Sequence, residues 1–201
     1  MEKMNDKNTM IRDVNIVDMI LIDHRLIKGY IETLCSENGS KYQKLKVAKE
    51  FLTLILKHSH AEEEILYSAI RNNDVFHSII LESEIEHQIF QDQVKHLKPS
   101  VSRSKNLSEE VEAELNVLIG LVRNHLKNEE SELLSQMNTY LDKKVLVELG
   151  VKFMKKRKMT LADFENYPHL RDELIHWKDE VQKISSKFLS QIDKCVENLK
   201  H

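Results

Sequence analysis

Residues 51–70, FLTLILKHSHAEEEILYSAI, place ionisable side chains in the middle of a helical apolar stripe. Phe51 and Ile55 lie four residues apart on one helix face, and His58 and Glu62 continue that face at similar spacing. Such a face normally stays apolar, because burying a carboxylate without a partner is energetically costly. The stretch therefore predicts a long core-facing helix whose polar residues share a buried partner.

The composition excludes most other architectures. The 201 residues include only four glycines and two prolines, whereas an average chain has about 7% Gly and 5% Pro. Sandwiches, barrels and glycine-rich phosphate loops need such turn residues, so an all-helical fold remains. With 30 Lys and Arg against 33 Asp and Glu, the charge is balanced, and no nucleic-acid or membrane partner is expected.

Periodicity and capping signals divide the chain into helices separated by short polar breaks. The expected helices span about residues 11–35, 41–70, 74–98, 109–137 and 140–158, with Pro99 ending the third, and a last amphipathic helix spans about 170–199. The first four predict an all-α, up-down-up-down four-helix bundle within a domain of residues 1–160. Residues 161–201 are predicted to form a C-terminal amphipathic helical extension.

Each bundle helix carries a histidine near the middle of its apolar face, and in two helices a glutamate follows one turn later. These residues are His24, His58 with Glu62, His87, and His125 with Glu129. The four-residue spacing puts each histidine and its glutamate on the same face, about 5–6 Å apart. Beyond Glu62, the apolar face is expected to continue at Ile65 and Ala69.

Four imidazoles and two carboxylates at one level of a bundle core need a common partner. A dinuclear iron or manganese site supplies one, because such sites are built from these ligands in bundle cores. An internal repeat supports this interpretation: His24, His58 and Glu62 recur as His87, His125 and Glu129 at offsets of 63, 67 and 67 residues. Each half would offer two histidines to one metal and a carboxylate to both.

These six residues and the sequence around them resemble the hemerythrin-like, or HHE cation-binding, domain family. The resemblance lies in the strings DHR (23–25), HSHAEEEILY (58–67), EHQ (86–88), HLKNEESELL (125–134) and ELGVKFMKKR (148–157). It implies a non-haem centre of two iron ions with an oxo or hydroxo bridge. It places His24 and His58 on one iron and His87 and His125 on the other, with Glu62 and Glu129 bridging.

One position departs from the oxygen-carrying members of that family. They have a further histidine one turn after the third-helix ligand, and this chain has Gln91 there. Water, Gln91 or a carboxylate such as Glu63 or Glu130 would then complete the second iron's ligands. The departure argues against reversible oxygen carriage and favours sensing, redox or peroxide chemistry.

The resemblance thus implies a protein that binds dioxygen or a related small oxidant, in oxygen or redox sensing or oxidant handling. Whether it is an enzyme stays open. A protein partner or a homodimer formed through the C-terminal helix is a further expectation. The N-terminal stretch MEKMNDKNTMIRD lacks an apolar segment, and Cys35 and Cys195 make no disulfide framework, so a cytoplasmic location is expected.

Two alternatives remain. A ferritin-like di-iron oxidase would use the E-x-x-H pairs Glu84/His87 and Glu173/His176, and a metal-free helical interaction module would need no ion at all. Among residues outside the candidate site, His60, His77 and His96 are expected at the surface. The basic run of residues 155–158 is interpreted as exposed cations at a helix C-terminus, where the helix dipole favours positive charge.

Overall fold

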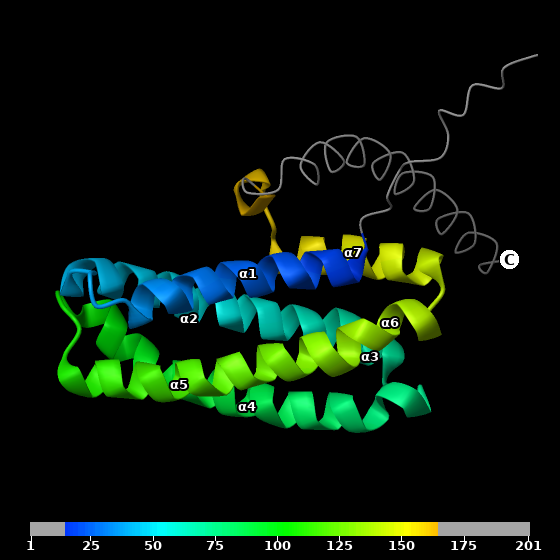
Figure 1. Cartoon of the computed structure of the whole chain (residues 1–201), viewed down its shortest axis with the longest axis horizontal. Coiled ribbons are helices and arrows are strands. Elements are labelled where there is room, and N and C mark those ends of the chain that lie inside the picture. The colour runs from blue at the N-terminus through cyan, green and yellow to red at the C-terminus, as the bar shows by residue number, and fades with distance from the viewer. Residues whose placement is uncertain (1–14, 165–201) are drawn as a thin grey trace, which may run out of the picture. The chain divides into compact units, whose positions relative to one another are not determined.

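The computed structural model describes residues 15–164, and all the regular structure in that part of the chain is helical. Four antiparallel rods form the bundle (Figure 1). The first rod is α1 (Ile16–Cys35), and the third is α4 (Asp74–Arg103). The second joins α2 (Lys41–Ala61), η1 (Glu62–Tyr67) and α3 (Ser68–Ile70), and the fourth joins α5 (Glu109–Asn128), η2 (Glu129–Leu134) and α6 (Ser135–Tyr140). The predicted all-α, up-down-up-down four-helix bundle is confirmed.

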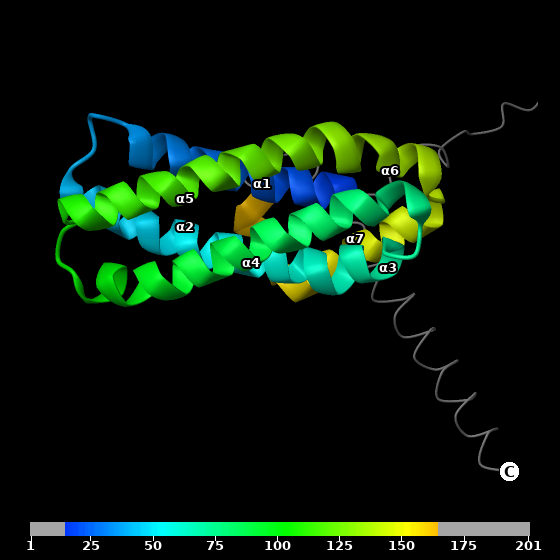
Figure 2. The same cartoon turned by 90° about the horizontal axis from the view of Figure 1, so that it is seen from below.

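Each rod contacts two neighbours, since α1 and α4 both pack against α2 and α5 (Figure 2). Side-chain caps fix where the rods begin. Asn15 starts α1 with a capping box, Ser40 does the same for α2, and Ser108 accepts a hydrogen bond from the backbone amide of Val111 at the start of α5. These caps satisfy backbone amides that have no partner within the helix, and the apolar stripe of each rod determines the face that it turns inward.

A continuous apolar core fills the half of the bundle nearest the α1–α2 and α4–α5 connections. It runs from Ile27 to Leu34 on α1 and includes Phe51 on α2, Val94 on α4 and Leu118 on α5. The six predicted site residues lie just beyond this core and are also buried. The site is therefore held between rods that apolar packing has already fixed.

Two short π-helical segments, η1 and η2, begin directly at Glu62 and Glu129. A π-helical segment holds one extra residue, so the downstream face moves by about one position. This overturns the expected continuation at Ile65 and Ala69, which are half-buried and exposed. The buried residues there are Leu66, Tyr67 and Ile70.

Pro99 does not end the third rod, contrary to the sequence prediction. The helix α4 continues through Pro99 to Arg103, although proline lacks the amide that would bond to the carbonyl of Lys95. The continuation buries Val101, which is 1% exposed, in the apolar core. Burial of that side chain gives a physical reason for the helix to tolerate the missing hydrogen bond.

Beyond the four rods, α7 (Lys143–Arg157) packs along α1, α2 and η1. The close approach requires a glycine, because a Cβ on Gly150 would lie 2.8 Å from the backbone carbonyl carbon of Asn15. The helix ends at Lys158, whose φ of 57° is left-handed. The bundle and α7 form one compact unit, Asn15–Met159.

A second unit includes Thr160 and the residues after it. There Thr160 donates its backbone amide to Asp163 at the start of η3 (Leu161–Phe164). The predicted helix at 170–199 and the start of the first helix at 11–14 lie outside the described residues.

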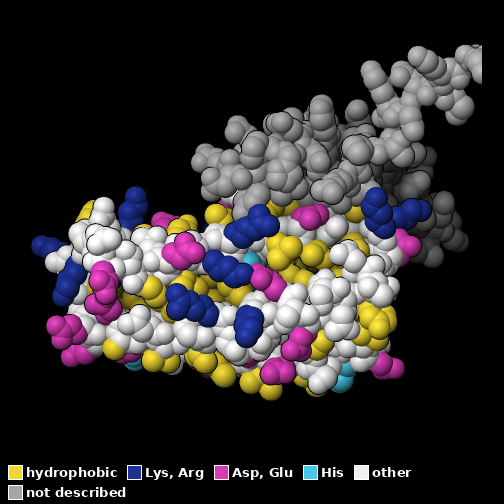
Figure 3. Space-filling model, viewed as in Figure 1, with side chains coloured by type: hydrophobic (Ala, Val, Ile, Leu, Met, Phe, Trp, Pro, Cys, Tyr) yellow, Lys and Arg dark blue, Asp and Glu magenta, His cyan; other side chains and the backbone are white. Residues whose placement is uncertain are grey.

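On the face shown in Figure 3, basic and acidic side chains are interspersed, with hydrophobic side chains between them. Among residues 15–164, none of the helices combines the length and the apolar character needed to cross a bilayer.

Candidate metal centre

The six residues predicted from the helical stripes come together in the bundle interior. All are 3% exposed or less, and they form two groups whose ligand atoms lie within 4.8 Å of one another. The first group is His24, His58, Glu62 and Glu129, and the second is Glu62, His87 and His125. Both groups could hold a metal ion, and they share Glu62.

The carboxylates connect the two halves of the bundle. Glu62 places Oε1 3.2 Å from His58 Nε2 and Oε2 3.4 Å from His87 Nε2. Glu129 places Oε2 3.2 Å from His24 Nε2 and 3.6 Å from His125 Nε2. Each glutamate therefore reaches one histidine of each group, as a bridging ligand must.

Each histidine has a second carboxylate on its outer side. His24 Nδ1 lies 2.8 Å from Glu130, His87 Nδ1 3.1 Å from Glu63, and His125 Nδ1 2.6 Å from Glu86. His58 Nδ1 lies 3.3 Å from Asp23 Oδ2. A carboxylate at Nδ1 favours the tautomer protonated there, which leaves the Nε2 lone pair pointing inward.

Sequence reasoning missed Asp23 and Glu86 altogether and treated Glu63 and Glu130 only as candidate ligands. A signal was present in the sequence. Asp23 and Glu86 directly precede the predicted ligands His24 and His87, and Glu63 and Glu130 directly follow the predicted ligands Glu62 and Glu129. These four positions repeat with the same two-fold pattern as the ligands. Only the packed bundle shows which histidine each carboxylate reaches.

Burial and charge push the pKa values of these groups apart. Burial lowers the pKa of His58 to about 4 and also lowers that of His87. At His24, burial alone would lower the pKa, but Glu129 and Glu130 raise it above 6.5. Burial and the neighbouring charge of Glu129 raise the pKa of Glu62 well above its usual range, whereas the surrounding histidines, against the effect of burial, lower the pKa of Glu129.

Most inward-facing atoms of the first group lack hydrogen-bond partners. Within the described residues, these unpaired atoms include Nε2 of His24 and His58 and all four carboxylate oxygens of Glu62 and Glu129. Buried polar atoms are nearly always hydrogen-bonded, so this concentration needs an explanation. Metal ions would bind these nitrogen and oxygen atoms directly, and the donor set fits iron or manganese.

A comparison with models of protein families also identifies a cation-binding domain in this part of the chain. The model of the Hemerythrin HHE cation binding domain matches residues 15–137. The chain belongs to this family. Neither the comparison with curated proteins nor that with solved structures found a match. The matched residues of this HHE domain include all six predicted ligands, and α7 lies beyond them.

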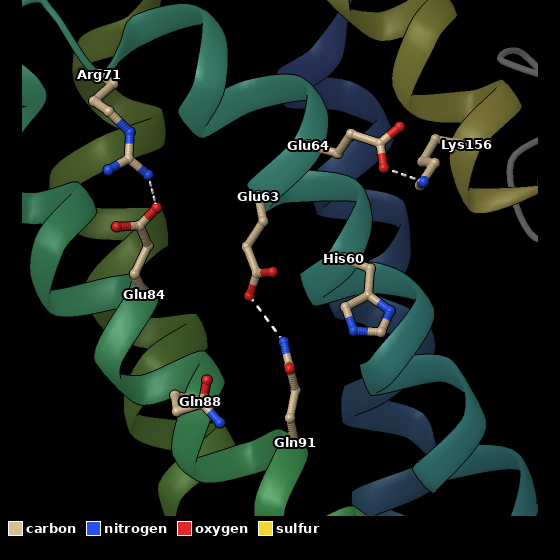
Figure 4. Close-up of a pocket in the computed structure, with 8 residues that line it drawn as sticks. All are labelled: His60, Glu63, Glu64, Arg71, Glu84, Gln88, Gln91 and Lys156. Carbon is tan, nitrogen blue, oxygen red and sulfur yellow. Dashed lines mark hydrogen bonds and ion pairs between the residues drawn. The ribbon is translucent and has the colours of Figure 1, made fainter.

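Outside the second metal group of the HHE domain, a polar pocket of about 610 Å³ opens between η1 and α4 (Figure 4). Glu63 and Gln91 point toward each other across it, and Gln91 Nε2 donates a 2.9 Å hydrogen bond to Glu63. Glu63 is also the outer partner of His87. Gln91, the departure noted in the sequence, thus supports an outer carboxylate in this structure.

The structure also locates four other residues that the sequence analysis considered, three histidines and Glu84. His60, His77 and His96 are exposed, as expected. Glu84, needed by the ferritin-like alternative, forms an ion pair with Arg71 beside the pocket and belongs to neither metal group. Its proposed companions, Glu173 and His176, lie outside the described residues.

The sequence interpretation also missed Tyr67. This fully buried side chain stacks on His87 with ring centroids 5.5 Å apart, and its hydroxyl has no hydrogen bond of normal geometry. Burial and the charges of Glu129 and Glu62 raise its pKa well above 10, so the phenol stays protonated. The π-helical shift at η1 brings Tyr67 to the inner face, which a regular helical period does not predict.

Proposed function

We propose that this HHE-domain protein is a non-haem di-iron protein that binds dioxygen or a related small oxidant, in oxygen or redox sensing or oxidant handling. The observation that carries the proposal is the pair of buried His/Glu groups joined by Glu62, with unpaired donor atoms facing inward. Nitrogen and carboxylate donors without a thiolate suit iron, and the bundle core is where carboxylate-bridged pairs are built.

In this proposal His24 and His58 hold one iron, and His87 and His125 hold the other. Glu62 and Glu129, which each reach histidines of both halves, would bridge the two irons together with an oxo or hydroxo ligand. A ferrous pair bound by these residues would supply two electrons to a small oxidant.

The protein's own residues orient the ligands and restrict water. Carboxylates hydrogen-bond to Nδ1 of His24, His87 and His125, and Asp23 lies 3.3 Å from Nδ1 of His58. These contacts favour ring orientations that direct Nε2 toward the centre. Phe90 packs against His125 at 5.3 Å between ring centroids, and Phe153 packs against His58 at 6.2 Å. These aromatic side chains limit the access of water and protons to the ligands.

Gln91 favours oxidant handling or sensing over reversible carriage. Its amide is hydrogen-bonded to Glu63, so it adds no nitrogen to the second group. The pocket beyond Glu63 offers a polar approach to His87 from the surface. The exposed, free Cys35 suits a reducing compartment, and the proposal includes a cytoplasmic location and a partner or second copy that binds residues 161–201.

Anaerobic purification, metal counting and absorption spectra before and after exposure to air test the proposal. We expect about two irons per chain and a spectral change with air, peroxide or nitric oxide. A spectrum that recovers when oxygen is removed would indicate a carrier, and catalytic consumption of the oxidant would indicate an oxidoreductase. A well-folded chain that takes up no iron from excess ferrous salt would contradict the proposal and support the metal-free interaction module.

A further inference from the structure

The last turn of α7 contains a buried cation. Arg157 is 5% exposed, and its Nε donates a 2.8 Å hydrogen bond to Oδ2 of Asp23 on α1, whose side chain is fully buried. The sequence interpretation of residues 155–158 as exposed charges is wrong at this position. The helical turn that exposes Lys155 and Lys158 directs Arg157 into the bundle, where a carboxylate is available to pair with it.

This ion pair reaches a proposed metal ligand through a single carboxylate. The Asp23 oxygen that accepts from Arg157 is the same oxygen that lies 3.3 Å from His58 Nδ1. Phe153, one turn earlier on α7, packs edge-on against the His58 ring at an interplanar angle of 81°. Two residues of α7 therefore fix the position of His58 from outside the four-helix bundle.

The neighbouring Lys156 strengthens the attachment of α7 near the same group. It forms an ion pair with Glu64 in η1, the segment that begins with the shared ligand Glu62. The end of α7 is thus joined to two of the four elements that carry candidate ligands or outer partners of the first metal group, namely α1 through Asp23 and η1 through Glu64.

Asp23 differs from the other three outer carboxylates in its surroundings. The side chains of Glu130, Glu63 and Glu86 are 29%, 32% and 22% exposed, so water stabilises their charge, whereas the Asp23 side chain is 0% exposed. A buried carboxylate needs a paired cation to stay ionised and oriented. Arg157 supplies that cation from a helix that lies beyond the family match at residues 15–137.

We propose that Arg157 is a positioning residue for His58, acting through Asp23, and that metal binding in the first group and docking of α7 strengthen each other. The inference rests on the proposed function, because it assumes that His58 binds a metal. The coupling is reciprocal: if a docked α7 raises metal affinity by some factor, bound metal must favour docking by the same factor. Metal occupancy would thereby control how firmly α7, the helix that precedes residues 160–201 in the chain, docks on the bundle.

Metal release tests the first half of the proposal. The protein is loaded anaerobically with ferrous iron, and the rate at which each equivalent passes to a chelator is measured. We expect Arg157→Ala to release one of two metals faster, by up to about tenfold, because loss of the direct outer partner itself costs about 10- to 100-fold in affinity and Arg157 acts one step further out. Arg157→Lys keeps the charge and should restore most of the slow release, and Lys155→Ala, an exposed charge two residues away, should match the wild type.

Hydrogen exchange tests the reciprocal half with a readout that needs no activity. In the wild type, backbone amides of residues 143–157 should exchange more slowly when iron is bound, and in Arg157→Ala this metal-dependent protection should disappear. If Arg157→Ala fails to fold, the neutral pair Asp23→Asn/Arg157→Gln replaces it and should show the same loss.

Wild-type release rates and unchanged metal-dependent protection in the folded variants would overturn this inference and leave the di-iron proposal intact. A wild-type chain that binds no iron would overturn both.

Discussion

The Nε2 atoms of His87 and His125 face each other at 3.1 Å while carboxylates hold both rings from behind. The outer carboxylates favour the tautomer of each ring in which Nδ1 donates. In that tautomer both Nε2 atoms carry lone pairs, and two lone pairs at this distance repel each other. A cation bound by both nitrogens removes the repulsion. The outer carboxylates therefore prepare the pair for a metal by fixing which nitrogen holds the proton.

Glu86→Gln tests that role at the second group. A neutral amide oxygen accepts the His125 Nδ1 proton less strongly than a carboxylate, so we expect affinity for one of two metals to fall about 10- to 100-fold. Competition with a chelator measures the change. Glu82→Gln, an exposed residue one turn earlier on α4, is the matched control, and equal affinities in the two variants would refute the assignment.

Removing ligands tests the dinuclear arrangement. His58→Ala or His125→Ala should each lose at least one of about two metals per chain, because each removes a nitrogen from a different group. The double variant Glu62→Ala/Glu129→Ala should lose both, since it removes the two carboxylates that belong to the groups and reach histidines of both halves. Metal counting on folded protein decides the matter, and retention of both metals in the double variant would contradict bridging.

Metal affinity should fall in acid, and His24 should be the first of the candidate ligands His24 and His58 to take up a proton. Burial lowers the pKa of His24, but Glu129 and Glu130 outweigh burial and raise this pKa above 6.5. At His58, by contrast, burial lowers the pKa to about 4. His24 must lose a proton to bind, so affinity is full above its pKa and falls by up to about tenfold per pH unit below it. Chelator competition across this range measures the slope.

Glu130→Gln provides the control for this pH dependence. The variant removes one of the charges that raise the pKa of His24, so the loss of affinity should begin at a lower pH than in the wild type. A wild-type affinity that is the same at about pH 8 and about pH 6 would be inconsistent with histidine ligation.

Deleting Ser131 should be tolerated. The exposed Ser131 lies in η2, where the π-helical segment holds one residue more than a regular helix, so its removal restores α-helical register with the downstream core face preserved. Deleting the exposed Asn116 from α5 instead rotates His125 and Glu129 by about 100°. Circular dichroism and thermal unfolding should show a folded Ser131 deletion and a severely destabilised Asn116 deletion; similar losses in both would disprove the register argument.

Helix spacing predicted most of the bundle because burial follows the helical period. Phe51, Ile55, His58 and Glu62 are buried as expected, and so are His24 on α1 and His87 on α4. The prediction failed at Ile65 and Ala69, where a π-helical segment changes the period, and at Pro99, where the burial of Val101 accompanies continuation of the helix. Both failures depend on contacts with other helices, which a local pattern does not contain.

The sequence by itself determined the four rods, their inward faces and the six candidate ligands, because periodic burial makes an ionisable residue in an apolar stripe conspicuous. Only the tertiary structure decided that Asp23 serves His58, that Glu130 serves His24, and that Arg157 is buried against Asp23. Those partners come from different helices, and Arg157 lies 134 residues from Asp23 along the chain. The distance between them is set by how the rods pack, and no local spacing encodes it.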